Sequence, residues 1–195
     1  MTFTEFKERY DYEGSVVLLE GKRNVREADR NKLHELGRLL ASTTEKMIFR
    51  SGNAPGSDEL FAGGVASVAP DRMQVIVPYT GHRKKQNRDF DTVSLDDVNL
   101  SEEPEVVYQS KANKKTEKHI DRYVAGDHNK FTVKAAYIIR DTVKVLGTEE
   151  VPPATFGIFY DDLQKPKSGG TGHTINVCRQ NDIPAIDQSV WFEWL

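Results

Sequence analysis

The sequence has little of several features that define large classes of proteins. It contains one cysteine, Cys178, among 195 residues, so an internal disulfide framework is excluded and a reducing, cytoplasmic location is expected. No window approaches the roughly 18 apolar residues of a membrane span, and the N-terminus has no apolar signal core. The formal net charge is -3 and the pI is near 6.0, so a global excess of positive charge for nucleic acid or anionic membranes is absent.

What is present suffices for one sizeable hydrophobic core. Hydrophobic residues make up 37% of the chain and include nine Phe, seven Tyr and two Trp. A chain of this length is expected to form one domain, here residues 1–195.

The first half alternates between strand and helix patterns. Short apolar runs predict strands, and apolar residues at helical spacing, such as Leu33, Leu36 and Leu40, predict helices. We expect strands at 15–19, 47–49 and 73–77, with helices at about 25–42 and from Ser57 onward.

The pattern stops between about residues 80 and 110, where a basic run at 82–88 is followed by an acidic one at 89–105. We expect a loop-rich insertion over the sheet edge there. Beyond it the alternation resumes, with predicted helices at 113–123, 131–146 and 172–180 and predicted strands at 154–160 and 183–186. Gly147 is the expected C-terminal cap of the second of these helices.

Alternating strands and helices predict an α/β fold with a mainly parallel sheet covered by helices on both faces. Ligands of such sheets bind at the carboxyl ends of the strands. Three glycine-bearing loops, at 21–23, 50–56 and 168–172, are predicted to meet at that edge.

These loops have the composition of a phosphate site. Glycine lets backbone N–H groups approach a ligand, a helix N-terminus favours an anion, and hydroxyl and guanidinium groups add donors. The alternative is that they are plain turns in which glycine only provides positive φ. We favour the phosphate site because the three loops occur together; its predicted members are Gly21, Lys22, Arg23, Arg50, Ser51, Gly52, Gly56, Ser57, Ser168, Gly169, Gly170, Thr171, Gly172, His173 and Thr174.

The same segments carry a family resemblance. Residues 21–23 read G-x-R, residues 36–41 read Leu-Gly-Arg-Leu-Leu-Ala, residues 50–61 read RSG-x-A-x-G-x-D-x-x-F, and residues 169–174 form a second glycine signature. This pattern resembles the SLOG superfamily of Rossmann-like domains, which includes DNA-processing protein A (Smf) and the lonely-guy nucleotide phosphoribohydrolases. Within it, the chain is most similar to short, often phage-encoded members related to the YspA group.

The resemblance implies a Rossmann-like three-layer sandwich that binds a nucleotide or nucleotide-derived ligand. Some relatives sense or sequester nucleotides, some hydrolyse an N-glycosidic bond, and DNA-processing protein A binds single-stranded DNA. It also implies that Arg140 faces the site and that the chain forms a homodimer or higher homo-oligomer. We expect a sensor or sequestering protein first, with N-glycosidase and single-stranded DNA binder as alternatives.

The chain departs from the hydrolase pattern because no carboxylate follows the second glycine signature before Asp182. Any glycosidase chemistry would then fall to Asp58 or Glu59, with His173 as a proton donor or phosphate ligand. The structural alternative for Asp58 is a helix cap or a partner for Arg50.

No metal or cofactor is expected. The histidines at 34, 82, 119 and 128 do not have the spacing of metal ligands, either to one another or to Cys178. Cys178 itself is expected to lie on a buried helix face rather than to act as a nucleophile. The basic runs at 82–88 and 111–118 would suit a nucleic-acid backbone, but a solvated surface is the favoured interpretation.

Overall fold

The computed structural model describes residues 1–87, 89–112, 114–166 and 168–195. Within these residues, six parallel strands form one sheet in the order β4-β3-β2-β1-β5-β6. From β1 the chain adds strands first on one side and then on the other, so its winding reverses between β1 and β5. The strands are β1 (Val16–Gly21), β2 (Ile48–Ser51), β3 (Met73–Val77), β4 (Asp91–Ser94), β5 (Phe156–Tyr160) and β6 (Ala185–Ile186).

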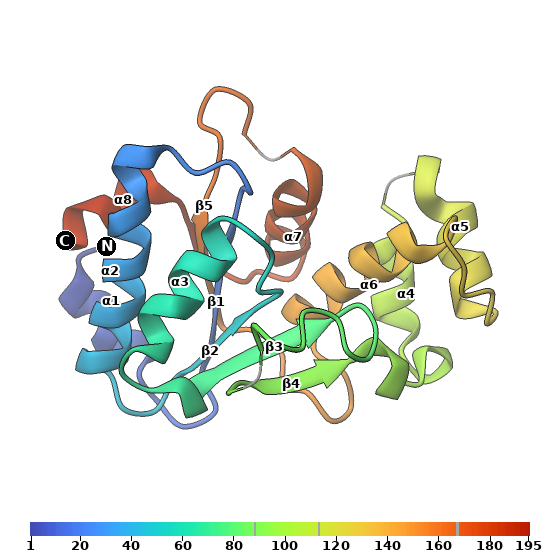
Figure 1. The fold of residues 1–195 in the computed structure, drawn as a ribbon, viewed down its shortest axis with the longest axis horizontal. Coiled ribbons are helices and arrows are strands. Elements are labelled where there is room, and N and C mark those ends of the chain that lie inside the picture. The colour runs from blue at the N-terminus through green and yellow to red at the C-terminus, as the bar shows by residue number, and fades with distance from the viewer. Residues whose placement is uncertain (88, 113, 167) are drawn as a thin grey trace.

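Helices cover both faces of this sheet (Figure 1). One layer contains α1 (Phe3–Tyr10), α2 (Glu27–Thr43), α3 (Ser57–Ala66) and α8 (Gln188–Trp191). The other contains α4 (Pro104–Ser110), α5 (Lys114–Val124), α6 (Val133–Leu146) and α7 (Gly169–Gln180). The predicted α/β, Rossmann-like three-layer sandwich is therefore confirmed. Short 3-10 turns are η1 (Pro70–Arg72), η2 (Leu95–Asp97), η3 (Leu100–Glu102) and η4 (Phe192–Trp194).

Strand β1 shows why its sequence is an unbroken apolar run. Val17 and Leu19 lie in the core beneath α2 and α3, whereas Leu18 packs on the opposite face with Val177 and Cys178 of α7. Successive strand residues point to opposite faces, so a strand covered on both sides must be apolar throughout. The burial of Cys178 on a helix face is as predicted.

The structure corrects two predicted boundaries. Helix α7 begins at Gly169 rather than at about 172, so the glycine cluster forms its first turn instead of a preceding loop. The expected loop-rich insertion at 80–110 contains the edge strand β4 and the helix α4. Strand β4 has only four residues and lies within an acidic run, which hides its strand pattern. Residue 113, where we predicted a helix to begin, lies outside the described residues.

The C-terminus packs on the body of its own chain. Trp191 is fully buried and its indole N–H donates to the carbonyl oxygen of Phe159 at 2.9 Å. The indole of Trp194 donates to the carbonyl of Met1 and its ring lies against Phe6. Among the described residues, no helix combines the length and the apolar character needed to cross a bilayer.

Candidate functional site

A cavity of about 940 Å³ opens at the carboxyl ends of β1 and β5. This is the point where the winding of the sheet reverses, and in open α/β sheets it is the place where ligands bind. Its walls come from the loops after β1 and β5, from α6 and from the first turn of α7. The predicted residues that line it are Gly21, Lys22, Arg23, Asp58, Arg140, Ser168, Gly169, Gly170 and Thr171.

Lys22 holds two walls of the cavity together. Its ammonium group donates to the carbonyl oxygen and to the hydroxyl of Ser168, at 2.5 and 2.8 Å, and lies 3.3 Å from a carboxylate oxygen of Asp161. The loop after β1 is thus tied to the segment that leads into α7. This arrangement gives the rim of the cavity a fixed shape around the helix N-terminus.

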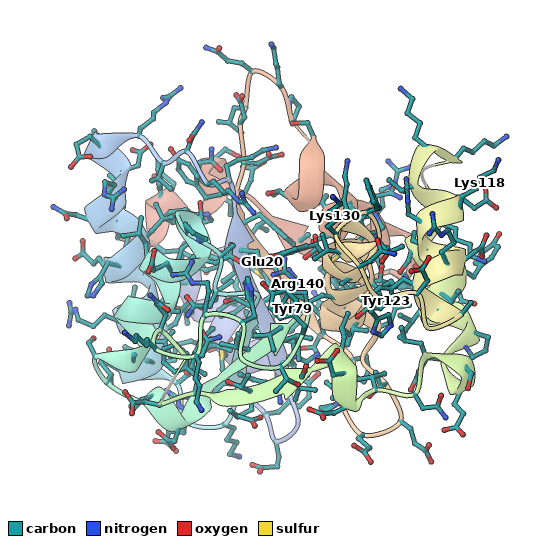
Figure 2. The ribbon with its side chains drawn as sticks, turned by 45° about the vertical axis from the view of Figure 1, so that its right-hand side comes forward. Glu20, Tyr79, Lys118, Tyr123, Lys130 and Arg140 are labelled. Atoms are coloured by element: carbon teal, nitrogen blue, oxygen red, sulfur yellow. The ribbon has the colours of Figure 1, made fainter. Side chains whose placement is uncertain are left out.

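Four ionisable side chains meet in the floor of the cavity, where β1 faces α6, and Figure 2 labels two of them, Glu20 and Arg140. Lys144 Nζ forms two ion pairs, with Oε1 of Glu20 at 2.5 Å and with Oδ1 of Asp141 at 2.8 Å. The contact with Glu20 does not have the geometry of a hydrogen bond. The guanidinium of Arg140 donates to that same Asp141 oxygen at 2.7 Å. All four side chains are buried. We call Glu20, Arg140, Asp141 and Lys144 the floor cluster.

The floor cluster separates the pKa values of its two carboxyl groups. Burial raises the pKa of Glu20 to about 7, against the opposing pull of Lys144, and the nearby carboxylates of Asp58 and Asp141 add to the rise. Burial also penalises ionised Asp141, but Arg140 and Lys144 outweigh it and hold the pKa of Asp141 well below its usual range. Near neutral pH the floor cluster therefore contains one carboxyl that exchanges its proton and one that stays ionised.

Asp58 lies in the first turn of α3 and joins two of the loops. One carboxylate oxygen accepts the backbone N–H of Gly21 at 3.0 Å, and the other accepts that of Ala54 at 3.3 Å. Burial raises the pKa of Asp58 despite the opposing charges of Lys144 and Arg140. Asp58 lines the cavity. Its hydrogen-bond partners are these two backbone groups and not Arg50, which we considered from the sequence.

The glycines of the three loops serve two different purposes. A Cβ at Gly21 would lie 2.3 Å from the carbonyl oxygen of Tyr160, and one at Gly56 would lie 2.3 Å from that of Arg23. These two positions need glycine because backbones approach each other closely. At Gly169, by contrast, a Cβ would meet no atom within 4 Å, and at Gly170 it would meet only an oxygen of Asp141 at 3.1 Å. Gly169 therefore leaves open space at the cavity, whereas Gly170 accommodates the close approach of Asp141.

Arg50 is a correction to the predicted site. Its side chain is fully buried beneath α6 and does not line the cavity. The guanidinium donates to the carbonyl oxygens of Lys144 and Pro152 and to Gln74. A cation at carbonyl groups of the last turn of a helix stabilises that helix end. We therefore remove Arg50 from the predicted phosphate ligands.

Of the loop that follows β2, Ala54 lines the cavity, but the predicted residues Ser51, Gly52, Gly56 and Ser57 do not. The hydroxyl of Ser51 accepts the N–H of Asn53, and that of Ser57 donates to the carbonyl of Lys22 at 2.6 Å. A Cβ at Gly52 would lie 2.7 Å from the guanidinium of Arg140, so Gly52 makes room for that side chain. These contacts account for Ser51, Gly52, Gly56 and Ser57 by packing rather than by ligand binding.

Four further predicted residues do not face the cavity. His173 contacts the hydroxyl of Thr142 on α6 at 2.9 Å, and burial lowers its pKa. Glu59 forms a 2.7 Å ion pair with Arg83 at the surface. The hydroxyl of Thr174 donates to the carbonyl of Gly170 within α7, and Gly172 is likewise absent from the lining. The predicted catalytic roles of Glu59 and His173 are therefore not supported.

Sequence reasoning missed three members of the floor cluster. Glu20 ends an apolar run and was interpreted as the strand terminus. Asp141 and Lys144 lie beside the apolar stripe of α6, and the spacing of Arg140 and Lys144 by four residues places both on one side of that helix. Charged residues within a predicted core helix were the available signal.

The basic runs behave as solvated surface over most of their length. Lys111 pairs with Asp121, and Lys118 lies on the outward side of α5 (Figure 2). Arg83 forms an ion pair with Glu59. Arg88, the last residue of the first basic run, lies outside the described residues.

Comparisons with known proteins agree with this architecture. No protein-family model matches the chain, and no curated protein matches it. Among solved structures, DNA processing protein A from Helicobacter pylori is similar, with a TM-score of 0.51, 13% sequence identity, and coverage of 95% of this chain and 68% of that one. That protein binds single-stranded DNA. At this identity the likeness shows the fold alone, so membership of the SLOG superfamily and a phage origin stay predictions.

Proposed function

We propose that the chain binds a nucleotide, or another phosphorylated nucleoside derivative, in the cavity at the carboxyl ends of β1 and β5, and acts as a sensor or sequestering protein. The observation that carries the proposal is the open space at Gly169, which begins the first turn of α7 at the switch point of the sheet. The first N–H groups of a helix have no partner within the helix and sit at its positive end. Because glycine has no side chain, phosphate oxygens have room to reach these N–H groups.

The remaining lining suits a nucleoside. Tyr137, Tyr160 and Phe192 offer aromatic surface to a base, and the carboxyl groups of Glu20 and Asp58 offer acceptors for ribose hydroxyls. A volume of about 940 Å³ lies within the range of small-molecule sites, about 300–1,000 Å³.

Thermal unfolding in the presence of each common nucleoside monophosphate tests this proposal. A ligand at 100 times its Kd stabilises a protein by about 2.7 kcal/mol, which is readily measured. Arg23→Ala, at the cavity wall, should weaken binding by about tenfold through the loss of one charged hydrogen bond. Arg9→Ala, on α1 and outside the lining, is the matched control and should leave the affinity unchanged. Absence of stabilisation by any mono-, di- or triphosphate would contradict the proposal.

Cleavage of the N-glycosidic bond is a second candidate, favoured by the two buried carboxyl groups of Glu20 and Asp58 in the cavity. Glu20 replaces the glutamate that the second glycine signature lacks. In this hydrolysis the C1′–N bond breaks and its electron pair leaves with the base, which takes a proton from one carboxyl group. Water adds to C1′ and gives its proton to a carboxylate.

Chromatography of free base distinguishes the two candidates. Turnover predicts base release by the natural protein and at least a hundredfold loss in Glu20→Gln, with binding retained. Stabilisation by a nucleotide without base release would exclude turnover of that nucleotide and leave the binding function standing.

The third hypothesis, binding of single-stranded DNA, is supported by the likeness to DNA processing protein A. The charge of the lining argues against a binding site for a polyanion, because the lining has as many acidic residues as basic ones. Steeply salt-dependent retardation of a single-stranded oligonucleotide would favour it over a mononucleotide ligand. The basic lining residues are Lys22, Arg23, Arg26, Lys134, Arg140 and Lys144, and the acidic ones are Glu20, Asp29, Asp58, Asp141, Asp161 and Asp162.

A further inference from the structure

A second groove of about 440 Å³ adjoins the main cavity. It lies where the end of β3 meets the segment that leads from α5 into α6, and it is lined by Tyr79, Tyr123, His128 and Lys130 among others. Val133, in the first turn of α6, lines both the groove and the main cavity. The two hollows therefore share a wall residue.

The groove contains a ready-made stacking surface. The imidazole of His128 lies parallel to the ring of Tyr123, with centroids 4.1 Å apart and an interplanar angle of 15°. Its Nε2 contacts the carbonyl oxygen of Tyr123 at 3.2 Å, which fixes the ring. Tyr123 is buried whereas His128 is exposed, so the outer face of the imidazole is open to solvent.

Aromatic contacts connect this surface to the main cavity. Tyr79, which is 39% exposed in the groove, meets His82 edge to face at 5.0 Å, and His82 meets Tyr137 edge to face at 5.7 Å. Tyr137 lines the main cavity. Figure 2 shows Tyr79 and Tyr123 on the α6 side of the sheet, with Lys130 close to the same helix. A chain of aromatic contacts therefore runs between the two hollows.

The charged groups around the groove complete the chemistry. Lys130 lines the groove and Lys134 lines the main cavity, so cations flank the shared rim at Val133. Asp96, also in the groove, already accepts the backbone N–H of Thr80 at 2.8 Å. An anionic linker that crosses the rim would meet two lysines, and a planar ring in the groove would meet His128 and Tyr79.

We infer that this groove is a subsite for a second base, and that the ligand class is two nucleosides joined through phosphate. The inference rests on the proposed function, because the first nucleotide occupies the main cavity. Bases of any kind stack on aromatic side chains, which gives such a subsite affinity with little base selectivity.

Titration calorimetry with four nucleoside 5′-monophosphates and the corresponding 5′-phosphorylated homodinucleotides tests the inference. The dinucleotide should bind at least tenfold more tightly than its mononucleotide, as expected for one added stacking contact. His128→Ala should remove most of that advantage and leave the mononucleotide affinity unchanged. His128→Phe, which keeps a flat ring, should retain the advantage. Tyr108→Ala, at a tyrosine that is 74% exposed on α4 outside the groove, is the matched control.

The outcomes separate this inference from the proposed function. Equal affinities for mononucleotide and dinucleotide, or an equal loss of both in His128→Ala, would overturn the second subsite while the nucleotide function stands. Failure of every mononucleotide and dinucleotide to bind would overturn both.

Discussion

Lys144 Nζ lies 2.5 Å from Oε1 of Glu20, and both side chains are buried in the floor of the cavity. A buried cation is costly to desolvate, and here two acidic neighbours compensate it, since Asp141 lies 2.8 Å away on the other side. The pKa of Lys144 is raised because these carboxyl groups outweigh the penalty of burial. Lys144 therefore stays charged and neutralises the floor cluster.

Lys144→Met should destabilise the protein, because it leaves the buried carboxylates without their shared cation. We expect the free energy of unfolding at pH 8, measured with urea, to fall by about 3–5 kcal/mol. Lys134→Met, at an exposed position of the same helix, should change it by less than about 0.5 kcal/mol. Adding Glu20→Gln to Lys144→Met should recover part of the loss, and strict additivity of the two changes would contradict this account of the pair.

The raised pKa of Glu20 makes stability depend on pH. The unfolded chain loses this proton near pH 4.5, whereas the folded protein keeps it until about pH 7. Between these values the folded state binds more protons, so the free energy of unfolding falls as pH rises, by an amount on the order of 3 kcal/mol for this group. Asp58, whose pKa is also raised, acts in the same direction.

Comparison with Glu20→Gln isolates this contribution. Urea unfolding at several pH values from 4.5 to 8 should show a smaller decline with pH in the variant than in the natural protein. Asp141 has a lowered pKa, so its contribution is lost only below about pH 4, and the lowered pKa values of His82 and His173 affect both proteins alike. Parallel pH curves for the two proteins would contradict a raised pKa of Glu20.

The architecture was predictable because local signals and burial agree along most of the chain. Strand β3 has the predicted bounds, since the apolar run from Met73 to Val77 is closed by Pro78. Gly147 ends α6 with a φ of 73°, a conformation that other residues adopt at a cost. The position of the cavity followed in turn, because parallel strands place their exit loops at one edge.

The chemistry of the site was less predictable because it depends on partners distant in sequence. Arg50 and Arg23 look alike as cations after buried strands, yet Arg50 faces carbonyl groups at the end of α6 and Arg23 faces the cavity. Glu20 reads as an ordinary strand terminus until Lys144 is placed opposite it, 124 positions later. Such long-range pairs leave no local pattern in a single sequence.

Gly169→Ala should separate ligand binding from stability. The backbone φ of 66° makes any side chain there strained by about 1–2 kcal/mol, but the new methyl group would meet no protein atom within 4 Å. It would occupy the space assigned to phosphate, so nucleotide affinity should fall at least tenfold. Gly126→Ala is a matched control, since Gly126 has a φ of 92°, equally open surroundings and no place in the cavity lining. Equal affinities of the two variants would contradict a phosphate site at α7.

The C-terminal segment is predicted to contribute strongly to the stability of the chain, because it packs on its own domain. Trp191 is fully buried and packs edge to face on Phe61, with ring centroids 5.7 Å apart. Its indole N–H also donates a hydrogen bond to Phe159, which a substitution would remove. Trp191→Ala should lower the free energy of unfolding by about 3–5 kcal/mol through the cavity that it leaves. Trp194→Ala should cost less, because that side chain is only half-buried. Urea unfolding followed by circular dichroism measures both changes. A larger loss at position 194 than at position 191 would show that the segment is anchored by its last turn instead of by the buried indole.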